Sequence, residues 1–160
     1  MKIKNLVDKT TSFLFKRLSE ATGLALFGLS VLLLISLISY SPEDPNFIFP
    51  ENAEINNLLG AKGSYTSDIL YQSIGLISLL VPFSFILISI LVIFDKKIIH
   101  IIESLFFVIL YSILGTLFFT VFHTETYWLT INGNNGFVGS LFEETFLINL
   151  INLNDQISYI

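Results

Sequence analysis

The chain has 160 residues and a formal net charge of −5, and 53% of its residues are hydrophobic whereas only 13% are charged. Soluble domains carry roughly 25% charged residues, so this composition excludes an ordinary soluble globular domain and favours a membrane protein. The sequence contains no cysteine, which excludes a disulfide framework and a thiolate metal site.

A basic segment, residues 1–20, precedes the first apolar run. Its cationic residues are Lys2, Lys4, Lys9, Lys16 and Arg17. Cytoplasmic flanks of membrane spans are enriched in Lys and Arg, so the segment predicts a cytoplasmic N-terminus. Apolar side chains lie among these cations. The segment therefore either rests on the anionic inner leaflet or only fixes the topology.

The first apolar run, residues 21–40, contains no charged residue. A helix that rises about 1.5 Å per residue needs roughly 20 apolar residues to cross about 30 Å of hydrocarbon, so we predict a first span here. A signal peptide has a shorter apolar core, about 7–15 residues, and a small-residue cleavage site. The following LISYSPEDP offers no such site, which favours an uncleaved span.

The motif SYSPEDPNF follows the first span and predicts where it ends. Pro42 and Pro45 cannot donate backbone N–H groups to a continuing helix. Glu43 and Asp44 are costly to bury in hydrocarbon, and Tyr40 suits the interface. We therefore expect the span to end at the outer face of the membrane and an outer loop to cover residues 41–68.

The second apolar run predicts a span over residues 69–94. Thr66 and Ser67 can cap its start, and Asp68 suits the positive end of the helix dipole. Pro82 falls near its middle, so we expect a kink there.

The third run predicts a span over residues 98–122, and it follows the short polar turn Asp95–Lys97. So short a connection predicts an antiparallel helical hairpin. Lys96 and Lys97 then lie on the same side as the basic N-terminal segment, which should be the cytoplasm. Glu103 is expected to be interfacial, with a functional carboxylate inside the membrane as the alternative.

The C-terminal part predicts an outer loop, residues 123–156, that contains a short amphipathic helix. Apolar residues recur near helical spacing over residues 137–151, with Glu143, Glu144 and Asn149 between them. A fourth span would begin near Asp155, and the chain ends at Ile160. The expected fold is thus an all-α membrane protein with three complete spans and the start of a truncated fourth.

The sequence predicts no catalytic, cofactor-binding or metal-binding residues, and hence no enzyme within this chain. It contains no G-x-x-x-x-G-K-[ST] phosphate loop, and GAKG at residues 60–63 lacks that spacing. His100 and His123 flank the third span, where about 23 helical residues separate them by roughly 35 Å. They therefore cannot share a metal ion.

Three stretches occur in a fixed order relative to the spans: SYSPEDPNF, NNLLGAKGSYTSDILYQSIGLISLLVPFSF and GNNGFVGSLFEET. The positions within the second that carry the pattern are Asn57, Gly60, Gly63, Asp68, Gln72, Gly75 and Pro82. In order and spacing, the stretches resemble the N-terminal four-span membrane domain of the FtsK/SpoIIIE family of bacterial DNA translocases. The resemblance covers about residues 23–139.

The resemblance implies a multi-pass anchor in the bacterial inner membrane that tethers a cytoplasmic hexameric ATPase motor at the division septum for chromosome segregation. The implied partners are the lipid bilayer, other division proteins and further copies of the full-length protein, whereas this segment would bind no nucleic acid. The motor's motifs have no counterpart in this chain. A cytoplasmic motor needs a fourth crossing, so we expect the chain to be a fragment cut near the start of that span or the product of a truncated open reading frame.

Two other function classes stay open at this point. A transporter or channel subunit would place ionisable residues inside its spans, and Glu103 alone offers that. A small self-contained regulatory membrane protein would fit the length of the chain but not the motif series.

Overall fold

The structure, a computed structural model, describes residues 2–45, 54–122, 129 and 133–143, and every element in these ranges is a helix. The elements are α1 (Lys2–Ile38), α2 (Gly60–Ile74), the 3₁₀ helix η1 (Gly75–Leu79), α3 (Leu80–Asp95), α4 (Ile99–Phe122) and α5 (Gly136–Glu143). Three helical stretches in the described part are long and apolar enough to cross a membrane: Leu6–Ile38, Gly60–Asp95 and Ile99–Phe122. The predicted all-α membrane fold is confirmed.

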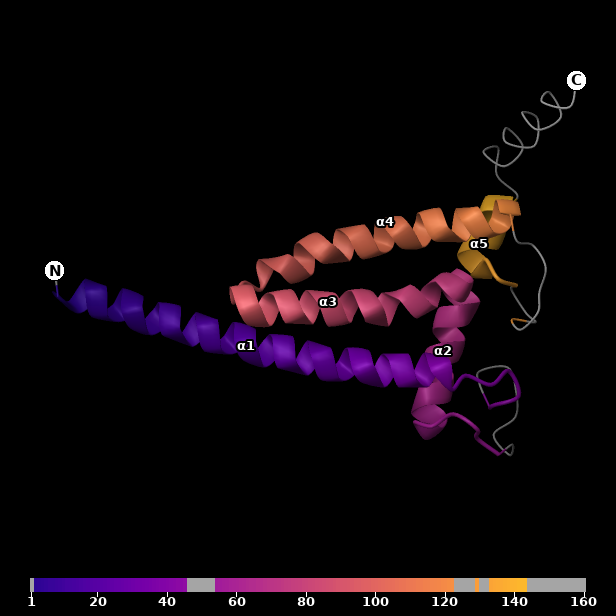
Figure 1. Cartoon of the computed structure of the whole chain (residues 1–160), viewed down its shortest axis with the longest axis horizontal. Coiled ribbons are helices and arrows are strands. Elements are labelled where there is room, and N and C mark those ends of the chain that lie inside the picture. The colour runs from indigo at the N-terminus through magenta and orange to yellow at the C-terminus, as the bar shows by residue number, and fades with distance from the viewer. Residues whose placement is uncertain (1, 46–53, 123–128, 130–132, 144–160) are drawn as a thin grey trace, which may run out of the picture.

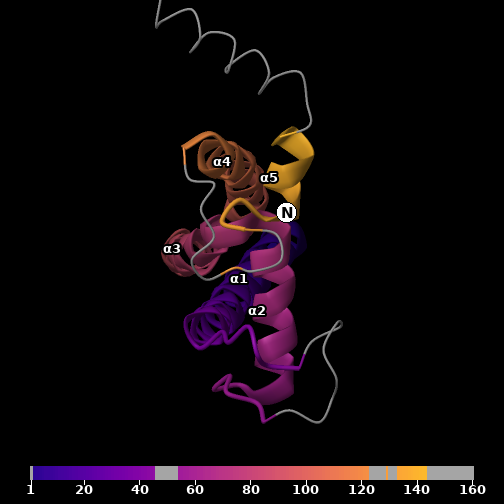
Figure 2. The same ribbon diagram turned by 90° about the vertical axis from the view of Figure 1, so that its right-hand side faces the viewer.

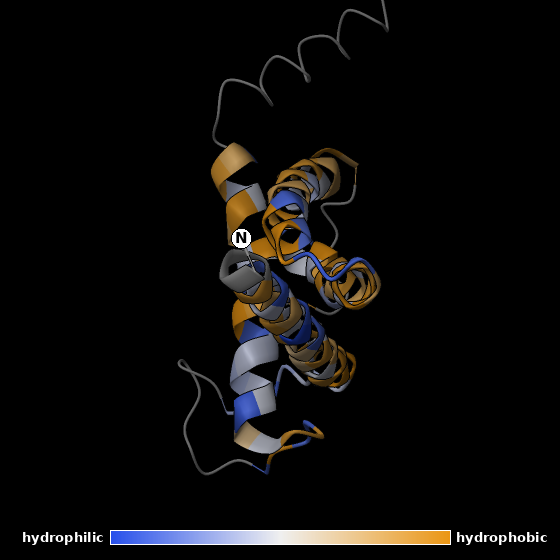
Figure 3. Ribbon diagram, turned by 90° about the vertical axis from the view of Figure 1, so that its left-hand side faces the viewer, coloured by the Kyte–Doolittle hydropathy of each residue, from blue (hydrophilic) through white to orange (hydrophobic). Residues whose placement is uncertain are grey.

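Helices α1, α3 and α4 lie lengthwise side by side, with α3 between the other two (Figure 1). Helix α2 crosses one end of this bundle, and α5 packs beside it against the end of α4 (Figure 2). We call this end, which contains Ser41–Pro45, the proline end. The opposite end, with Asp95–Lys97, is the lysine end. Apolar residues cover most of α3 and α4, and hydrophilic ones gather in the turn that joins them (Figure 3).

Helix α1 runs through the predicted boundary between the basic segment and the first span. Its 37 residues correspond to about 55 Å, which exceeds the roughly 30 Å of hydrocarbon in a bilayer. Its N-terminal part extends past the lysine end of α3 (Figure 1). The basic segment is therefore a helical continuation of the span.

Helices α1 and α3 approach closely because α1 carries a glycine where they cross. A Cβ atom added to Gly23 would lie 2.6 Å from Cγ1 of Ile93 and 3.1 Å from the carbonyl oxygen of Ser89. Small residues permit such approaches between membrane helices, where van der Waals packing replaces hydrophobic burial as the driving force. Val92 and Ile88 of α3 are buried in the cluster beside this crossing.

Replacing Gly23 by Leu should separate α1 from α3. We expect a loss of about 2 kcal/mol in the free energy of unfolding, a typical cost of overpacking. Reversible unfolding in mixed micelles, followed by circular dichroism, would measure it. Gly28→Leu is the matched control, because an added Cβ at Gly28 meets nothing within 4 Å. Equal losses in both variants would contradict the close crossing.

An ion-pair cluster joins α1 to the turn at the lysine end. Glu20 accepts from Lys96 at 2.8 Å and from Arg17 at 2.6 Å. The two cations, Lys96 first, hold the pKa of the Glu20 carboxyl below its ordinary value. The contribution of these ion pairs to folding stability is therefore fully present at pH values above the pKa of Glu20 in the unfolded chain. It is lost as the pH falls through the lowered pKa of Glu20 in the folded chain. All three side chains are partly or largely exposed, so this cluster orients the helix ends rather than supplying much stability.

The second apolar run is broken at Gly75, seven residues before Pro82, where the sequence predicts a kink. Gly75 has φ +64° and separates α2, which begins at Gly60 within the expected loop, from η1 and α3. Pro82 lies in the first turn of α3, where backbone N–H groups need no intrahelical partner. Proline is tolerated at this place in a helix, and the break itself lies at Gly75, whose positive φ suits glycine.

The third run forms α4 from Ile99 to Phe122, close to the predicted 98–122. Glu103 lies near its start and is exposed, and its Oε2 atom is 3.2 Å from Nδ1 of His100. The other ring nitrogen of His100 is 3.1 Å from Oδ2 of Asp95. Glu103 thus belongs to the polar lysine end, which favours the interfacial interpretation.

The predicted amphipathic helix is present as α5, Gly136–Glu143, at the proline end. Its Gly139 packs against α4, because an added Cβ would lie 2.7 Å from Oγ1 of Thr120. The remainder of the predicted helix, the start of the fourth span and His123 lie outside the described residues.

Candidate functional site

Polar side chains from four parts of the chain meet at the proline end, in what we call the proline-end junction. It comprises Ser36, Leu37, Tyr40, Asp44, Asn57, Gly63, Ser64, Ser67, Asp68 and Tyr71. All of them are buried, although several carry groups that are costly to remove from water. Their hydrogen bonds explain how this burial is tolerated.

Asp44 organises the turn after α1. Its carboxylate is 1% exposed, and it accepts hydrogen bonds from the backbone N–H of Asn56 at 2.8 Å and of Asn57 at 2.9 Å. The Asn56 side-chain amide donates a third bond at 3.2 Å. A buried carboxylate with three donors is well satisfied, so it fixes the segment that returns from the loop against the end of α1.

Asn57 connects this turn to both helices. Its amide nitrogen donates to the carbonyl oxygens of Ser36 at 2.9 Å and Ser39 at 3.3 Å, two groups left without intrahelical donors where α1 ends. Its amide oxygen accepts from the backbone N–H of Leu59 at 3.1 Å, just before α2 begins. One side chain therefore ties the end of α1 to the start of α2.

Helices α1 and α2 also touch directly through serine and glycine. The Ser36 hydroxyl donates to the carbonyl oxygen of Gly63 at 2.7 Å, and Ser64 donates to that of Pro45 at 3.0 Å. A Cβ atom on Gly63 would overlap the amide oxygen of Asn57. The glycine is therefore required for the approach of α2 to the Asn57 side chain.

Two tyrosines fill the space between α1 and α2. The rings of Tyr40 and Tyr71 have centroids 4.8 Å apart. The Tyr40 hydroxyl donates to Oδ1 of Asp68 at 3.3 Å, and the Tyr71 hydroxyl donates to the carbonyl oxygen of Leu37 at 3.1 Å. The sequence predicts Tyr40 at the membrane–water interface, and the structure shows its side chain buried in the junction. Asp68, predicted to favour the helix dipole, lies in the third turn of α2 and binds this tyrosine instead.

A second contact joins Gly75 to the GNNG segment, residues 133–136. The backbone N–H of Leu76 donates to the carbonyl oxygen of Asn134 at 3.0 Å. A Cβ on Gly75 would overlap that oxygen, and a Cβ on Gly136 would overlap the backbone nitrogen of Gly75. Both glycines have positive φ, and because neither carries a side chain, the backbone at Gly75 packs directly against the backbone of the GNNG segment. The side chain of Asn135 donates to Oγ1 of Thr120 on α4 at 3.1 Å.

The geometry of the junction suits rigid attachment of helices rather than catalysis. Most hydrogen bonds of Asp44 and Asn57 go to the backbone of the chain itself, and so hold segments of the chain together. Within the described ranges, no group of three or more His, Asp or Glu residues is placed to hold a metal ion. The junction fixes α1 relative to α2, and the contacts of the GNNG segment with Gly75 and Thr120 join this end of the bundle to α4 and α5.

Five of the positions that carry the sequence resemblance lie in these contacts. Asp44, Asn57, Gly63, Asp68 and Gly75 occupy the centre of the two contacts, although up to 31 positions separate them along the chain. The sequence reasoning did not find Ser36, Tyr71 or Asn135. The one available signal for Ser36 is a serine near the end of an apolar helix. Serine is common in membrane helices, so this signal does not single the residue out.

Comparison with known proteins gives a consistent result. The family described as the 4TM region of DNA translocase FtsK/SpoIIIE matches residues 15–154. A DNA translocase FtsK of Rickettsia bellii is 39% identical over 72 residues, which are 45% of this chain and 9% of that relative. The corresponding protein of Azospirillum brasilense is 37% identical over 68 residues, 41% of this chain and 11% of the relative. The chain thus spans about a tenth of the length of these relatives, and no solved structure is detectably similar to it.

Proposed function

Because this chain belongs to the family of the 4TM region of DNA translocase FtsK/SpoIIIE, we propose that it is the membrane anchor of a cell-division DNA translocase. In this role it tethers a cytoplasmic ATPase motor, which lies outside this chain, at the septum during chromosome segregation. Its contribution is geometric: confinement to the septal membrane raises the effective concentration of the motor at the place where DNA must move.

The observation that supports this role is the proline-end junction. An anchor that holds a motor under load needs its helices fixed to one another, and the junction fixes them through satisfied buried hydrogen bonds and glycine contacts. A transporter or channel would instead place ionisable groups along its spans. The described charged side chains of this bundle gather at its two ends, with Asp44 and Asp68 at one and Glu20, Lys96 and Glu103 at the other.

We propose that the lysine end and the N-terminus face the cytoplasm of the cell and that the membrane is the inner membrane. The basic residues of α1 and the turn residues Lys96 and Lys97 lie toward the same end of the bundle (Figure 1). The positive-inside rule places such residues on the cytoplasmic side.

The loop at the proline end is the proposed contact surface for other division proteins. Leu58 is 76% exposed and Ile55 is 42% exposed. The acidic Glu54, adjacent to Ile55 in the sequence, and Glu43 are exposed as well. Exposed apolar side chains rimmed by charge are typical of protein contact sites. Self-association of the full-length protein would follow from helix packing and from the motor, and this segment would bind no nucleic acid.

Fluorescence microscopy tests the septal role. A fluorescent protein fused to the N-terminus of the chain should concentrate at the division septum of dividing bacteria. Leu58→Glu, which changes the exposed loop without touching the junction, should reduce the septal signal while the fusion stays in the membrane. Uniform membrane fluorescence of the unchanged chain would contradict the septal anchor.

A further inference from the structure

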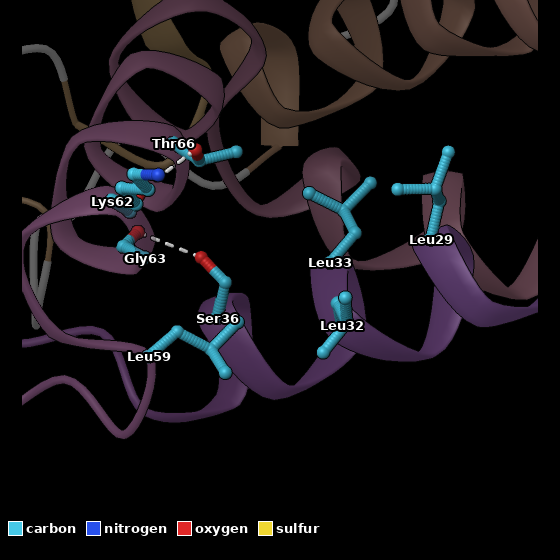
Figure 4. Close-up of a pocket in the computed structure, with 8 residues that line it drawn as sticks. All are labelled: Leu29, Leu32, Leu33, Ser36, Leu59, Lys62, Gly63 and Thr66. Atoms are coloured by element: carbon cyan, nitrogen blue, oxygen red, sulfur yellow. Dashed lines mark hydrogen bonds between the residues drawn. The ribbon is translucent and has the colours of Figure 1, made fainter.

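A groove opens between α1 and the start of α2 at the proline end, with a volume of ≈ 540 Å³. Figure 4 shows its lining: Leu29, Leu32, Leu33, Ser36, Leu59, Lys62, Gly63 and Thr66. Sites for small molecules occupy about 300–1,000 Å³, so the groove is large enough for part of a lipid. None of the junction's contacts fills it.

The groove is graded from apolar to polar along the axis of α1. Leu29 lies at its deep end, and Leu32 and Leu33 follow on the same face of the helix. Seven residues, or about 10 Å, separate Leu29 from Ser36 at the shallow end, which is about a third of the hydrocarbon thickness. Leu29 is 64% exposed and Leu32 is 47% exposed on this membrane-spanning helix, so lipid chains are what lies against them.

Lys62 supplies the one cation of the groove. The neighbouring hydroxyls are already used, because Ser36 donates to Gly63 and Thr66 donates to the carbonyl oxygen of Lys62 itself. The Lys62 ammonium has no ion-pair partner within the described part of the chain. The remaining basic residues of the sequence precede the first span or lie in the α3–α4 turn, so this is an isolated positive charge.

We propose that the groove binds one phospholipid, with an acyl chain along Leu29, Leu32 and Leu33 and the phosphate at the Lys62 ammonium. The apolar wall matches the chain, and the single free cation matches the anionic phosphate at the depth where a headgroup begins. A free phosphate would use Lys62 alone and would leave the apolar wall of the groove without an occupant. The inference depends on the membrane-spanning fold and not on the septal role.

Native mass spectrometry of the whole chain in detergent, with phosphatidylglycerol added, tests this. The unchanged protein should retain one lipid, and Lys62→Gln should weaken binding about fivefold, the effect of one lysine beside anionic lipid. Lys97→Gln at the opposite end is the matched control and should bind as the unchanged protein does. Diacylglycerol, which has the chains without the phosphate, should bind no better to the unchanged protein than to Lys62→Gln.

A second pair of variants tests the apolar wall. Leu29→Trp fills the deep end of the groove and should reduce binding, whereas Leu24→Trp, on an exposed α1 position outside the groove, should not. Inorganic phosphate should not displace the lipid. Equal lipid retention by Lys62→Gln and Lys97→Gln, displacement by phosphate, or blockage of the groove by a dimer of the chain would each overturn the proposal. Circular dichroism confirms that every variant is folded.

Discussion

Replacing Gly75 by Ala should cause the largest loss of stability of any single methyl addition in the described bundle, about 4 kcal/mol. The residue has φ +64° and ψ −147°, close to a region that is essentially restricted to glycine and that costs other residues about 1–3 kcal/mol. Its new Cβ would also overlap the carbonyl oxygen of Asn134, so the GNNG segment must move away at a further cost typical of overpacking, about 1–3 kcal/mol. Reversible unfolding in mixed micelles measures the sum.

Two other glycines separate the contributions to this loss. Gly60 has φ +65° but nothing within 4 Å of an added Cβ, so Gly60→Ala should show the backbone cost alone. Gly28 is helical with open space around it, and Gly28→Ala should be neutral or gain up to about 1 kcal/mol from helix propensity. If Gly75→Ala were no more harmful than Gly60→Ala, backbone packing between Gly75 and the GNNG segment would be contradicted.

Removing the Asp44 carboxylate should cost about 3 kcal/mol. Asp44→Ala leaves the backbone N–H groups of Asn56 and Asn57 without their acceptor. Asn57 is buried, and a buried unsatisfied group costs about 1–3 kcal/mol, to which the loss of the partly buried bonds of Asn56 adds. Glu43→Ala is the matched control, since it removes a neighbouring carboxylate that is exposed. The same unfolding assay checks both variants, and a loss that is equal for the two would refute a role for Asp44 in the junction.

The junction should act as one unit, which a double-mutant cycle can show. The Asn57→Ala variant loses the hydrogen bonds from this side chain to the end of α1. The loss in the free energy of unfolding that this substitution causes should be smaller in an Asp44→Ala background than in the unchanged chain. The reason is that both residues hold the same segment in place. Strictly additive losses would mean that the two side chains stabilise separate features.

The spans were predictable because hydropathy depends only on composition over about 20 residues. The third predicted span agrees with α4 within a residue or so at each end. The break in the second run was not predictable in this way, because Gly75 is one small residue within a long apolar stretch and its positive φ depends on residues 134–136 far along the chain. The polar residues of α2, among them Ser64, Ser67 and Asp68, were the local sign that this part differs from α3.

The site was predictable through family resemblance but not through chemistry. Asn57 and Gly63 appear as ordinary loop residues by composition, because their roles arise from contacts with Ser36 of α1, which lies 21 and 27 positions away. The hydropathy pattern places Pro82 near the middle of the second run, whereas the helix that contains it begins at Leu80, so Pro82 lies in a first turn, where proline is tolerated. Helix α1 continues through its charged N-terminal part because lysine and arginine are themselves good helix formers.

The threading of the helices through the bilayer is tested most directly by single-cysteine labelling, for which a chain without native cysteine is a clean background. Glu43→Cys marks the proline end and Lys97→Cys marks the lysine end, and both positions are exposed. In bacteria with a permeabilised outer envelope and an intact inner membrane, a membrane-impermeant maleimide should label only the Glu43→Cys protein, whereas Lys97→Cys should react after lysis alone. Labelling of Lys97→Cys in the intact cells, or protection of Glu43→Cys, would contradict the account.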